Sequence, residues 1–169
     1  SPFITNSYEH DRPITPSEIV DEGLLSQEMI DEVERVAKAL FARGQEIALS
    51  HGLILVDTKY EFGLDTDGNL TLIDAIHTPD SSRYWKADSY QARFDKGEEP
   101  EYFDKEFLRL WFKDNCDPYK DEVLPEAPQE LVAELSRRYI EIYESITCKP
   151  FNHDFSQPIL ERINNNLLK

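Results

Sequence analysis

Residues 52–76 constrain the fold most, because their pattern is typical of two antiparallel strands joined by a turn. Residues 53–62 begin with an aliphatic run and pass into alternating polar and apolar side chains. The cluster 65–69, Asp-Thr-Asp-Gly-Asn, has strong turn chemistry, and residues 70–76 have the composition of a returning strand. The sequence therefore predicts a β-hairpin of 53–62 with 70–76.

Two longer segments have the periodicity of amphipathic helices. In residues 27–50 and again in residues 129–147, apolar side chains recur at three- and four-residue steps, with charges between them. Such helices bury one face against another element. We therefore expect an α+β fold, in which an antiparallel sheet containing the hairpin is covered by the helices near 27–50 and 129–147.

Charge restricts the partners of the chain. It has 34 acidic and 18 basic side chains in 169 residues, so its formal net charge is -16. A surface this acidic repels phosphodiester backbones and anionic lipids, which argues against nucleic-acid binding and membrane docking. The cysteines, Cys116 and Cys148, are too few for a disulfide framework. We expect a soluble protein in a reducing, cytoplasmic setting.

Several chemistries are excluded by missing motifs. The sequence contains no G-x-G-x-x-G, no Walker loop, no H-E-x-x-H and no G-x-S-x-G. Its histidines and cysteines also lack the spacing of a zinc site. The candidates that remain are carboxylates, hydroxyls and cations.

One face of the predicted hairpin carries a candidate metal site. Alternation places Asp57, Lys59 and Glu61 on the same face, and a turn centred on Asp67-Gly68 would put Asp74 directly opposite Glu61. Facing carboxylates repel, and a divalent cation would remove that penalty. Mg²⁺ suits two carboxylates completed by waters and substrate phosphates, which Lys59 could also meet. The alternative is a solvated face with a Lys59–Glu61 or Lys59–Asp57 surface pair.

The loop at 78–83 is a candidate phosphate site. It places the hydroxyls of Ser81 and Ser82 beside the guanidinium of Arg83, and a phosphate monoester needs such a group of donors. The alternative is an ordinary Asx or Ser turn with Arg83 at the surface.

A third candidate site lies on a predicted short helix after residue 104. Lys105 and Arg109 are four residues apart and would share a face, which hints at an anionic partner. The alternative is that a neighbouring acid, Glu101, Glu106 or Asp114, supplies the counter-charge.

Long motifs in the chain resemble a known enzyme family. They are GLILVDTKYEFG (52–63), LID (72–74) and TPDSSRYW (78–85), supported by EHD (9–11), DKEFLRLW (104–111) and RYIEIYE (138–144). In this order they resemble the phosphoribosylaminoimidazole-succinocarboxamide synthases, the SAICAR synthetases of purine biosynthesis, over roughly residues 8–148.

The resemblance implies an ATP- and Mg²⁺-dependent ligase that joins L-aspartate to CAIR, an aminoimidazole ribonucleotide carboxylate, with release of ADP and phosphate. It implies that the sheet is similar to the C-terminal, ATP-grasp-like part of these enzymes. Carried over by position, the implied catalytic residues are Lys59, Glu61 and Asp80.

The same resemblance assigns binding roles. Glu61 and Asp74 would hold Mg²⁺, with Lys59 on the ATP phosphates and Asp57 near the nucleotide or metal. The substrate CAIR would meet Ser81, Ser82 and Arg83 at its phosphate and Asp80 near its aminoimidazole. Lys105 and Arg109 would contact the anionic substrates.

The chain departs from the family pattern at particular positions. Ala75 and Leu110 stand where the family commonly has acidic residues, so one carboxylate near Asp74 is missing.

The chain also departs from the family in extent. The match covers the C-terminal half of the family, without the N-terminal phosphate loop. We expect residues 1–149 to be the catalytic region and 150–169 a tail of a fragment of the enzyme. The alternative is a truncated, non-catalytic paralogue that binds phosphoribosyl ligands or serves as an oligomerisation subunit, and a homo-oligomer is compatible with either.

Overall fold

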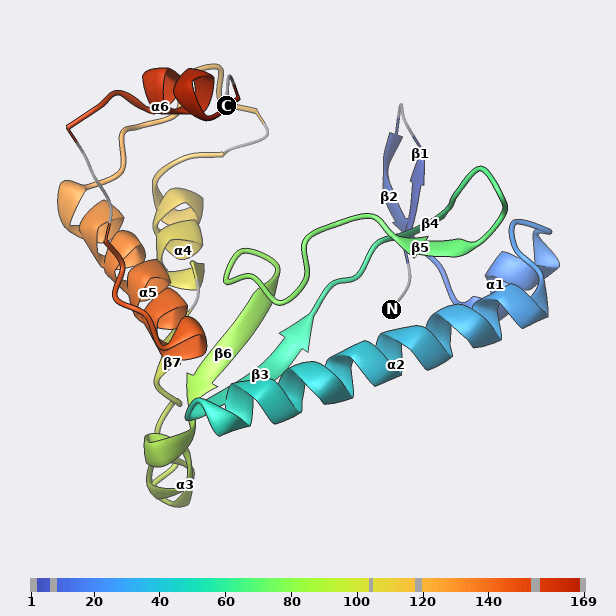
Figure 1. Cartoon of the computed structure of the whole chain (residues 1–169), viewed down its shortest axis with the longest axis horizontal. Helices are drawn as coiled ribbons and strands as arrows, with labels where there is room; N and C mark the ends of the chain where they lie inside the picture. The colour runs from blue at the N-terminus through green and yellow to red at the C-terminus, as the bar shows by residue number, and fades with distance from the viewer. Residues whose placement is uncertain (1–2, 7–8, 104, 118–119, 153–155, 168–169) are drawn as a thin grey trace. The chain divides into compact units, whose positions relative to one another are not determined.

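A computed structural model of the chain describes residues 3–6, 9–103, 105–117, 120–152 and 156–167 (Figure 1). The chain divides into two compact units, Ser1–Tyr102 and Phe103–Lys169. Asp104, which belongs to one of the family motifs, lies outside the described residues.

A small three-stranded sheet, in which β3 (Leu53–Thr58) and β6 (Ser82–Lys86) are antiparallel, lies at the centre of the first unit. Its strands, in sheet order, are β3, β6 and β7 (Tyr102–Phe103), the last at the boundary between the units. Leu53, Leu55 and Tyr84 are buried in the sheet, because alternate side chains of a strand point to the same face. This buried face is the core of the first unit.

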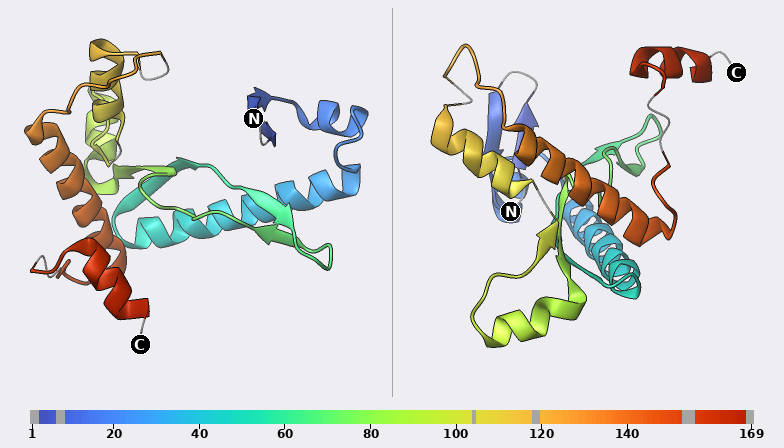
Figure 2. Two further views of the ribbon diagram at one scale, coloured as in Figure 1. Left: turned by 90° about the horizontal axis from the view of Figure 1, so that it is seen from above. Right: turned by 90° about the vertical axis from the view of Figure 1, so that its left-hand side faces the viewer.

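The long helix α2 (Gln27–Ser50) packs on β3, and Figure 2 shows the two elements side by side. Ser26 caps the helix by accepting a hydrogen bond from the backbone N–H of Met29 at 3.3 Å. Ala48 is buried near the C-terminal end of α2. The predicted helix over 27–50 and its packing on the sheet are therefore confirmed.

The remaining elements of the first unit are short. They are β1 (Phe3–Asn6), which pairs with β2 (Glu9–Pro13), then α1 (Pro16–Asp21), α3 (Ala87–Asp95), and β4 (Phe62–Leu64), which pairs with β5 (Leu70–Leu72). The turn between β4 and β5 has the predicted chemistry: Asp65 Oδ1 accepts from the backbone N–H groups of Asp67 at 2.9 Å and Asn69 at 2.8 Å, and Gly68 adopts a φ of +82°.

The antiparallel sheet with helices confirms the predicted α+β class, but the predicted hairpin is only partly correct. β3 pairs with β6, whereas residues 62–64 and 70–72 form a separate two-stranded sheet. Part of the segment interpreted as a loop at 78–83 is therefore a strand. Alternation identifies a strand and its buried face, but it does not identify the strand that pairs with it.

The second unit is helical, with α4 (Glu106–Asn115), α5 (Gln129–Thr147) and α6 (Ile159–Leu167). α4 contacts α5, and the guanidinium of Arg138 lies 4.3 Å from the centre of the Phe107 ring. The bounds of α5 confirm the predicted helix over 129–147, while its covering of the sheet stays a prediction. The expected tail contains α6. Among the described helices, none is long and apolar enough to cross a membrane.

Candidate functional site

The pairing of β3 with β6 brings two of the sequence motifs together. In the register of this pair, Asp57 lies opposite Arg83 and Thr58 lies opposite Ser82. The hydroxyls of Thr58 and Ser82 are 2.8 Å apart, and Ser82 is only 4% exposed. Residues separated by about 25 positions in the sequence therefore lie side by side at the end of the sheet.

Asp57 and Arg83 form an ion pair across the two strands. The Nε of Arg83 donates to both carboxylate oxygens of Asp57 at 2.9 Å, and its Nη2 also contacts Oδ2. The guanidinium holds the pKa of Asp57 below its usual range. Sequence reasoning assigned both residues to the site but missed this pair, which depends on a register shift between Leu55 and Asp57.

Lys59 and Glu61 pair with each other after β3 ends. The Lys59 ammonium donates to Glu61 Oε1, and both side chains are largely exposed. This is the surface pair that the sequence left open as an alternative. The backbone N–H of Lys59 also donates to the carbonyl of Ser81 at 3.3 Å, which joins this segment to the 78–83 loop.

The predicted register of Glu61 is wrong by one residue. The ladder pairs Phe62 with Leu72, and the backbone N–H of Ile73 donates to the Glu61 carbonyl at 3.0 Å, so Ile73 lies opposite Glu61. Asp74 comes next, and its Oδ1 accepts from the N–H of Ala75 at 2.8 Å. The tight hydrogen-bonded turn at 65–69 sets this register, and Asp74 lies beyond the end of β5.

No ready-made metal cage accompanies these carboxylates. In the part of the chain that the structure describes, no group of three or more His, Cys, Asp or Glu side chains is arranged to hold a metal ion. The magnesium site at Glu61 and Asp74 therefore stays a prediction.

The loop at 78–83 forms a hydroxyl cluster within a tight turn. The backbone N–H groups of Ser81 and Ser82 donate to the Thr78 carbonyl at 3.1 and 2.9 Å. The Ser81 hydroxyl lies 3.2 Å from that of Thr78 and 3.4 Å from that of Ser82. Asp80 is exposed at the tip. The turn of the alternative interpretation is therefore present, with Arg83 at the surface, and the phosphate site stays a prediction.

His77 joins two tyrosines beside these residues. The hydroxyl of Tyr60 lies 2.6 Å from His77 Nε2, and the hydroxyl of Tyr84 donates to the His77 carbonyl at 2.6 Å. Burial lowers the pKa of His77 and raises the pKa of Tyr84 to about 12, with a smaller contribution from Tyr60. Sequence reasoning considered His77 only as a zinc ligand and missed this cluster, since no periodicity marks it.

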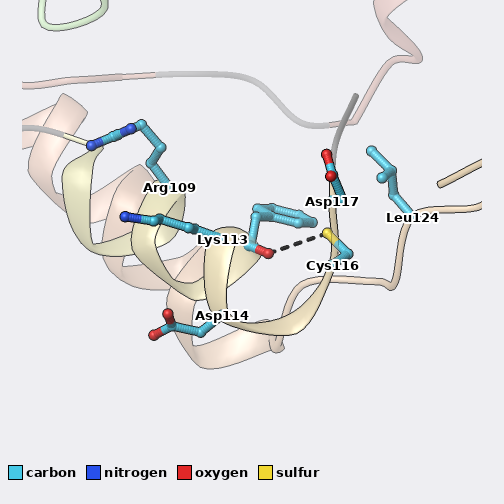
Figure 3. A pocket seen from close by; sticks show the side chains of 7 residues that line it. Arg109, Lys113, Asp114, Cys116, Asp117 and Leu124 are labelled. Carbon is cyan, nitrogen blue, oxygen red and sulfur yellow. Dashed lines mark hydrogen bonds between the residues drawn. The ribbon is translucent and has the colours of Figure 1, made fainter. Parts of the chain in front are cut away.

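Lys105 and Arg109 lie in the second unit. Lys105 is at the N-cap position of α4, and Arg109 Nε donates to Glu106 Oε2 at 2.7 Å, so one of the expected acidic neighbours does pair with it. Figure 3 shows Arg109 and Lys113 extending from α4 beside a hollow of about 880 Å³. The hollow is lined by Arg109, Phe112, Lys113, Asp114, Cys116, Asp117 and Leu124.

Comparison with known proteins gives consistent results. Residues 1–126 match the family model described as SAICAR synthetase. A phosphoribosylaminoimidazole-succinocarboxamide synthase of Legionella pneumophila (strain Lens) is 58% identical over 171 residues, covering 99% of this chain and 55% of that protein. The chain spans about half the length of the curated relatives it matches.

Solved structures give the same result for the fold. A SAICAR synthase from Saccharomyces cerevisiae, described as complexed with SAICAR, aligns with a TM-score of 0.65 at 32% identity, covering 86% of this chain and 46% of that one. A SAICAR synthetase described as in complex with ADP aligns with a TM-score of 0.62 at 27% identity, covering 89% of this chain and 51% of that one.

Proposed function

The chain belongs to the SAICAR synthetase family, and from that premise we propose that it carries the metal- and CAIR-binding part of an ATP-dependent ligase. The ligase joins L-aspartate to CAIR to give SAICAR, ADP and phosphate in de novo purine biosynthesis. The proposal extends to residues 1–149 as the catalytic region and to a cytoplasmic setting.

One observation carries the proposal: β3 and β6 place the family motifs at 52–63 and 78–85 side by side. Asp57 and Thr58 pair in register with Arg83 and Ser82, and Lys59 bonds to the backbone of Ser81. Cations, hydroxyls and carboxylates of the kinds that bind phosphorylated substrates thus share one end of the sheet.

A nucleotide role for this region is supported by the relative described as in complex with ADP. Lys59 would supply a point charge to the ATP phosphates once it exchanges its Glu61 partner for them. Glu61 and Asp74 would hold Mg²⁺, which when bound would neutralise the negative charge of the phosphates. Both carboxylates are exposed, but Ile73 and not Asp74 lies opposite Glu61, so Mg²⁺ binding by both would need the segment after β5 to bring Asp74 toward Glu61.

A CAIR role for the 78–83 loop is supported by the relative described as complexed with SAICAR. The hydroxyls of Ser81 and Ser82 and the guanidinium of Arg83 would bind the ribose phosphate. Asp57 orients the guanidinium of Arg83, because both of its carboxylate oxygens accept from Arg83 Nε. Asp80, at the tip of the loop, would contact the aminoimidazole.

In the proposed reaction, a CAIR carboxylate oxygen takes the γ-phosphoryl group of ATP, giving an acyl phosphate and ADP. The aspartate amine then attacks the acyl carbon, the new C–N bond replaces the C–O bond to phosphate, and the amine loses a proton. Lys105 and Arg109 would hold the anionic substrates. The side chains contribute mainly by positioning reactants and neutralising charge.

The test is Glu61→Gln in the full-length protein, measured as ADP release in the presence of ATP, Mg²⁺, CAIR and aspartate. The substitution keeps the shape of the side chain and removes the charge, so we expect a large loss of activity that added Mg²⁺ partly restores. The matched control is Glu46→Gln, an exposed carboxylate of α2 that pairs with Arg43. Unchanged ADP release by Glu61→Gln would contradict the metal assignment.

The second candidate function is binding of a phosphoribosyl ligand without turnover. In that case calorimetry would show Arg83-dependent binding of CAIR, and no ADP would form with all substrates present. Any turnover by the isolated chain would exclude this candidate. Ala75, which stands where the family commonly has an acidic residue, favours instead an oligomerisation subunit with a vestigial site.

A further inference from the structure

Two hydrogen bonds of 2.6 Å meet at His77. Tyr60 contacts the Nε2 of its ring, and Tyr84 donates to its backbone carbonyl. The rings of Tyr60 and His77 also pack edge to face, with their centres 5.7 Å apart. Tyr84 is 2% exposed, so its hydroxyl has a fixed position in the core.

Each member of this cluster lies beside a residue of the proposed site. Tyr60 stands between Lys59 and Glu61, and Tyr84 directly follows Arg83. His77 lies midway between Asp74 and Asp80 in the sequence. The two hydrogen bonds therefore connect the three chain segments that carry the proposed metal, nucleotide and CAIR contacts.

The position of the His77 ring is restricted from the side of α2. A Cβ atom on Gly44 would lie only 2.3 Å from His77 Cε1 and 2.8 Å from Leu55 Cδ2, so the ring occupies space that only a glycine leaves open. His77 itself has a φ of +57°, a left-handed conformation that costs energy for a residue with a side chain. Such a conformation persists where the surroundings over-determine it.

We propose that His77 is a positioning residue for the ligase reaction, fixing the segments of Lys59–Glu61, Asp80 and Arg83 relative to one another through Tyr60 and Tyr84. This inference rests on the proposed function. His77 acts through the two tyrosines and does not itself touch the substrates.

The protonation chemistry of the cluster agrees with this role. Burial lowers the pKa of His77 and raises the pKa of Tyr84 to about 12, so both groups are neutral at pH 7. A neutral imidazole can accept from the Tyr60 hydroxyl at Nε2, and a neutral Tyr84 hydroxyl can donate to the carbonyl. The cluster therefore holds its geometry without any buried charge.

The first test compares Tyr60→Phe with Tyr90→Phe in the full-length protein. Tyr60→Phe keeps the ring and removes the hydroxyl that contacts His77. The control retains the ring that stacks on Trp85 with centres 5.3 Å apart. Since one hydrogen bond is removed, we expect Tyr60→Phe to lower kcat/KM for CAIR by roughly three- to tenfold, while the kcat/KM of Tyr90→Phe stays near the wild-type value.

The second test asks whether a side chain of suitable length restores activity. His77→Gln can extend an amide to the position of Nε2, whereas His77→Asn is too short to reach Tyr60. Asn tolerates the left-handed backbone better than Gln. A positioning role therefore predicts that His77→Gln has a higher kcat/KM for CAIR than His77→Asn, despite its greater backbone strain. A purely structural role predicts that His77→Asn has the higher kcat/KM.

The outcomes separate the inference from the function on which it rests. Active wild-type protein together with equal kcat/KM values for Tyr60→Phe and Tyr90→Phe would overturn the positioning role alone. If the wild-type protein releases no ADP with ATP, Mg²⁺, CAIR and aspartate, the proposed function is wrong. The reaction in which His77 is proposed to position residues would then not exist.

Discussion

Replacing Gly44 with alanine adds one methyl group to α2 at the point where the helix faces His77. The new Cβ would lie 2.3 Å from His77 Cε1, 2.7 Å from Nδ1 and 2.8 Å from Leu55 Cδ2. Ordinary contacts between such atoms are near 3.5–4 Å. The imidazole is attached to a left-handed backbone and bonded to Tyr60, so it cannot turn away without losing that hydrogen bond.

The size of the effect follows from two opposing contributions. In a helix interior, glycine to alanine normally stabilises a protein by about 1 kcal/mol. Overpacking a filled site costs typically about 1–3 kcal/mol. With contacts this short, the second contribution is expected to be larger, which gives a net loss of about 1 kcal/mol in the free energy of unfolding. For a chain of this size that corresponds to a thermal midpoint lower by about 2–4 °C.

The assay is thermal unfolding of wild-type, Gly44→Ala and Gly63→Ala proteins under identical conditions. Gly63 is the matched control, since a Cβ there would meet Ile73 Cγ2 at 3.4 Å, close to ordinary contact. We expect Gly63→Ala to match or slightly exceed the wild-type midpoint, because alanine loses less backbone entropy on folding. A Gly44→Ala midpoint equal to or above that of the wild type would refute the close packing of His77 against α2.

Three further predictions concern charge and reactivity. Asp57→Asn should lower the free energy of unfolding by less than about 1 kcal/mol at pH 7, since the ion pair with Arg83 is exposed. Arg83 lowers the pKa of Asp57 in the folded state, so the free energies of unfolding of Asp57→Asn and wild type, measured by urea titration, should become equal as the pH falls through this lowered pKa. A difference that persists in acid would contradict the ion pair of Asp57 with Arg83. Arg137 and Arg138 of α5 lower the pKa of Glu134 to about 2. The difference in free energy of unfolding between wild type and Glu134→Gln should therefore be largest above pH 4.5 and disappear toward pH 2. A difference that does not depend on pH would contradict the pairing of Glu134 with these arginines. Iodoacetamide should label Cys148, which is exposed, before Cys116, whose pKa is raised by burial and by nearby carboxylates; mass spectrometry showing the reverse order would contradict this.

The local elements of the fold could be predicted because their signals are local. The periodicity of 27–50 and of 129–147 and the turn at 65–69 all depend on neighbouring residues, and each is confirmed. The partner of β3 could not be predicted in this way. Ser82 and Tyr84 form a buried strand face, but their neighbours also have the composition of a polar loop.

The residues of the candidate site were found from motifs, while their contacts required the fold. The pair of Asp57 with Arg83 depends on the β3–β6 register, and the contact of His77 with Tyr60 depends on a left-handed residue held against Gly44. Neither register nor backbone strain is visible in the spacing of residue types. The one-residue error at Glu61 has the same origin, because the turn geometry sets which residue lies opposite.

We propose that the residues at the end of the β3–β6 sheet serve an aspartate ligase. Product analysis by mass spectrometry with full-length protein, ATP, Mg²⁺, CAIR and aspartate tests this. We expect an adduct of CAIR and aspartate that has lost one water, with one ADP and one phosphate formed per adduct, and much less of this adduct from Arg83→Ala. Formation of ADP without aspartate-dependent product, or equal product from Arg83→Ala, would contradict the proposal.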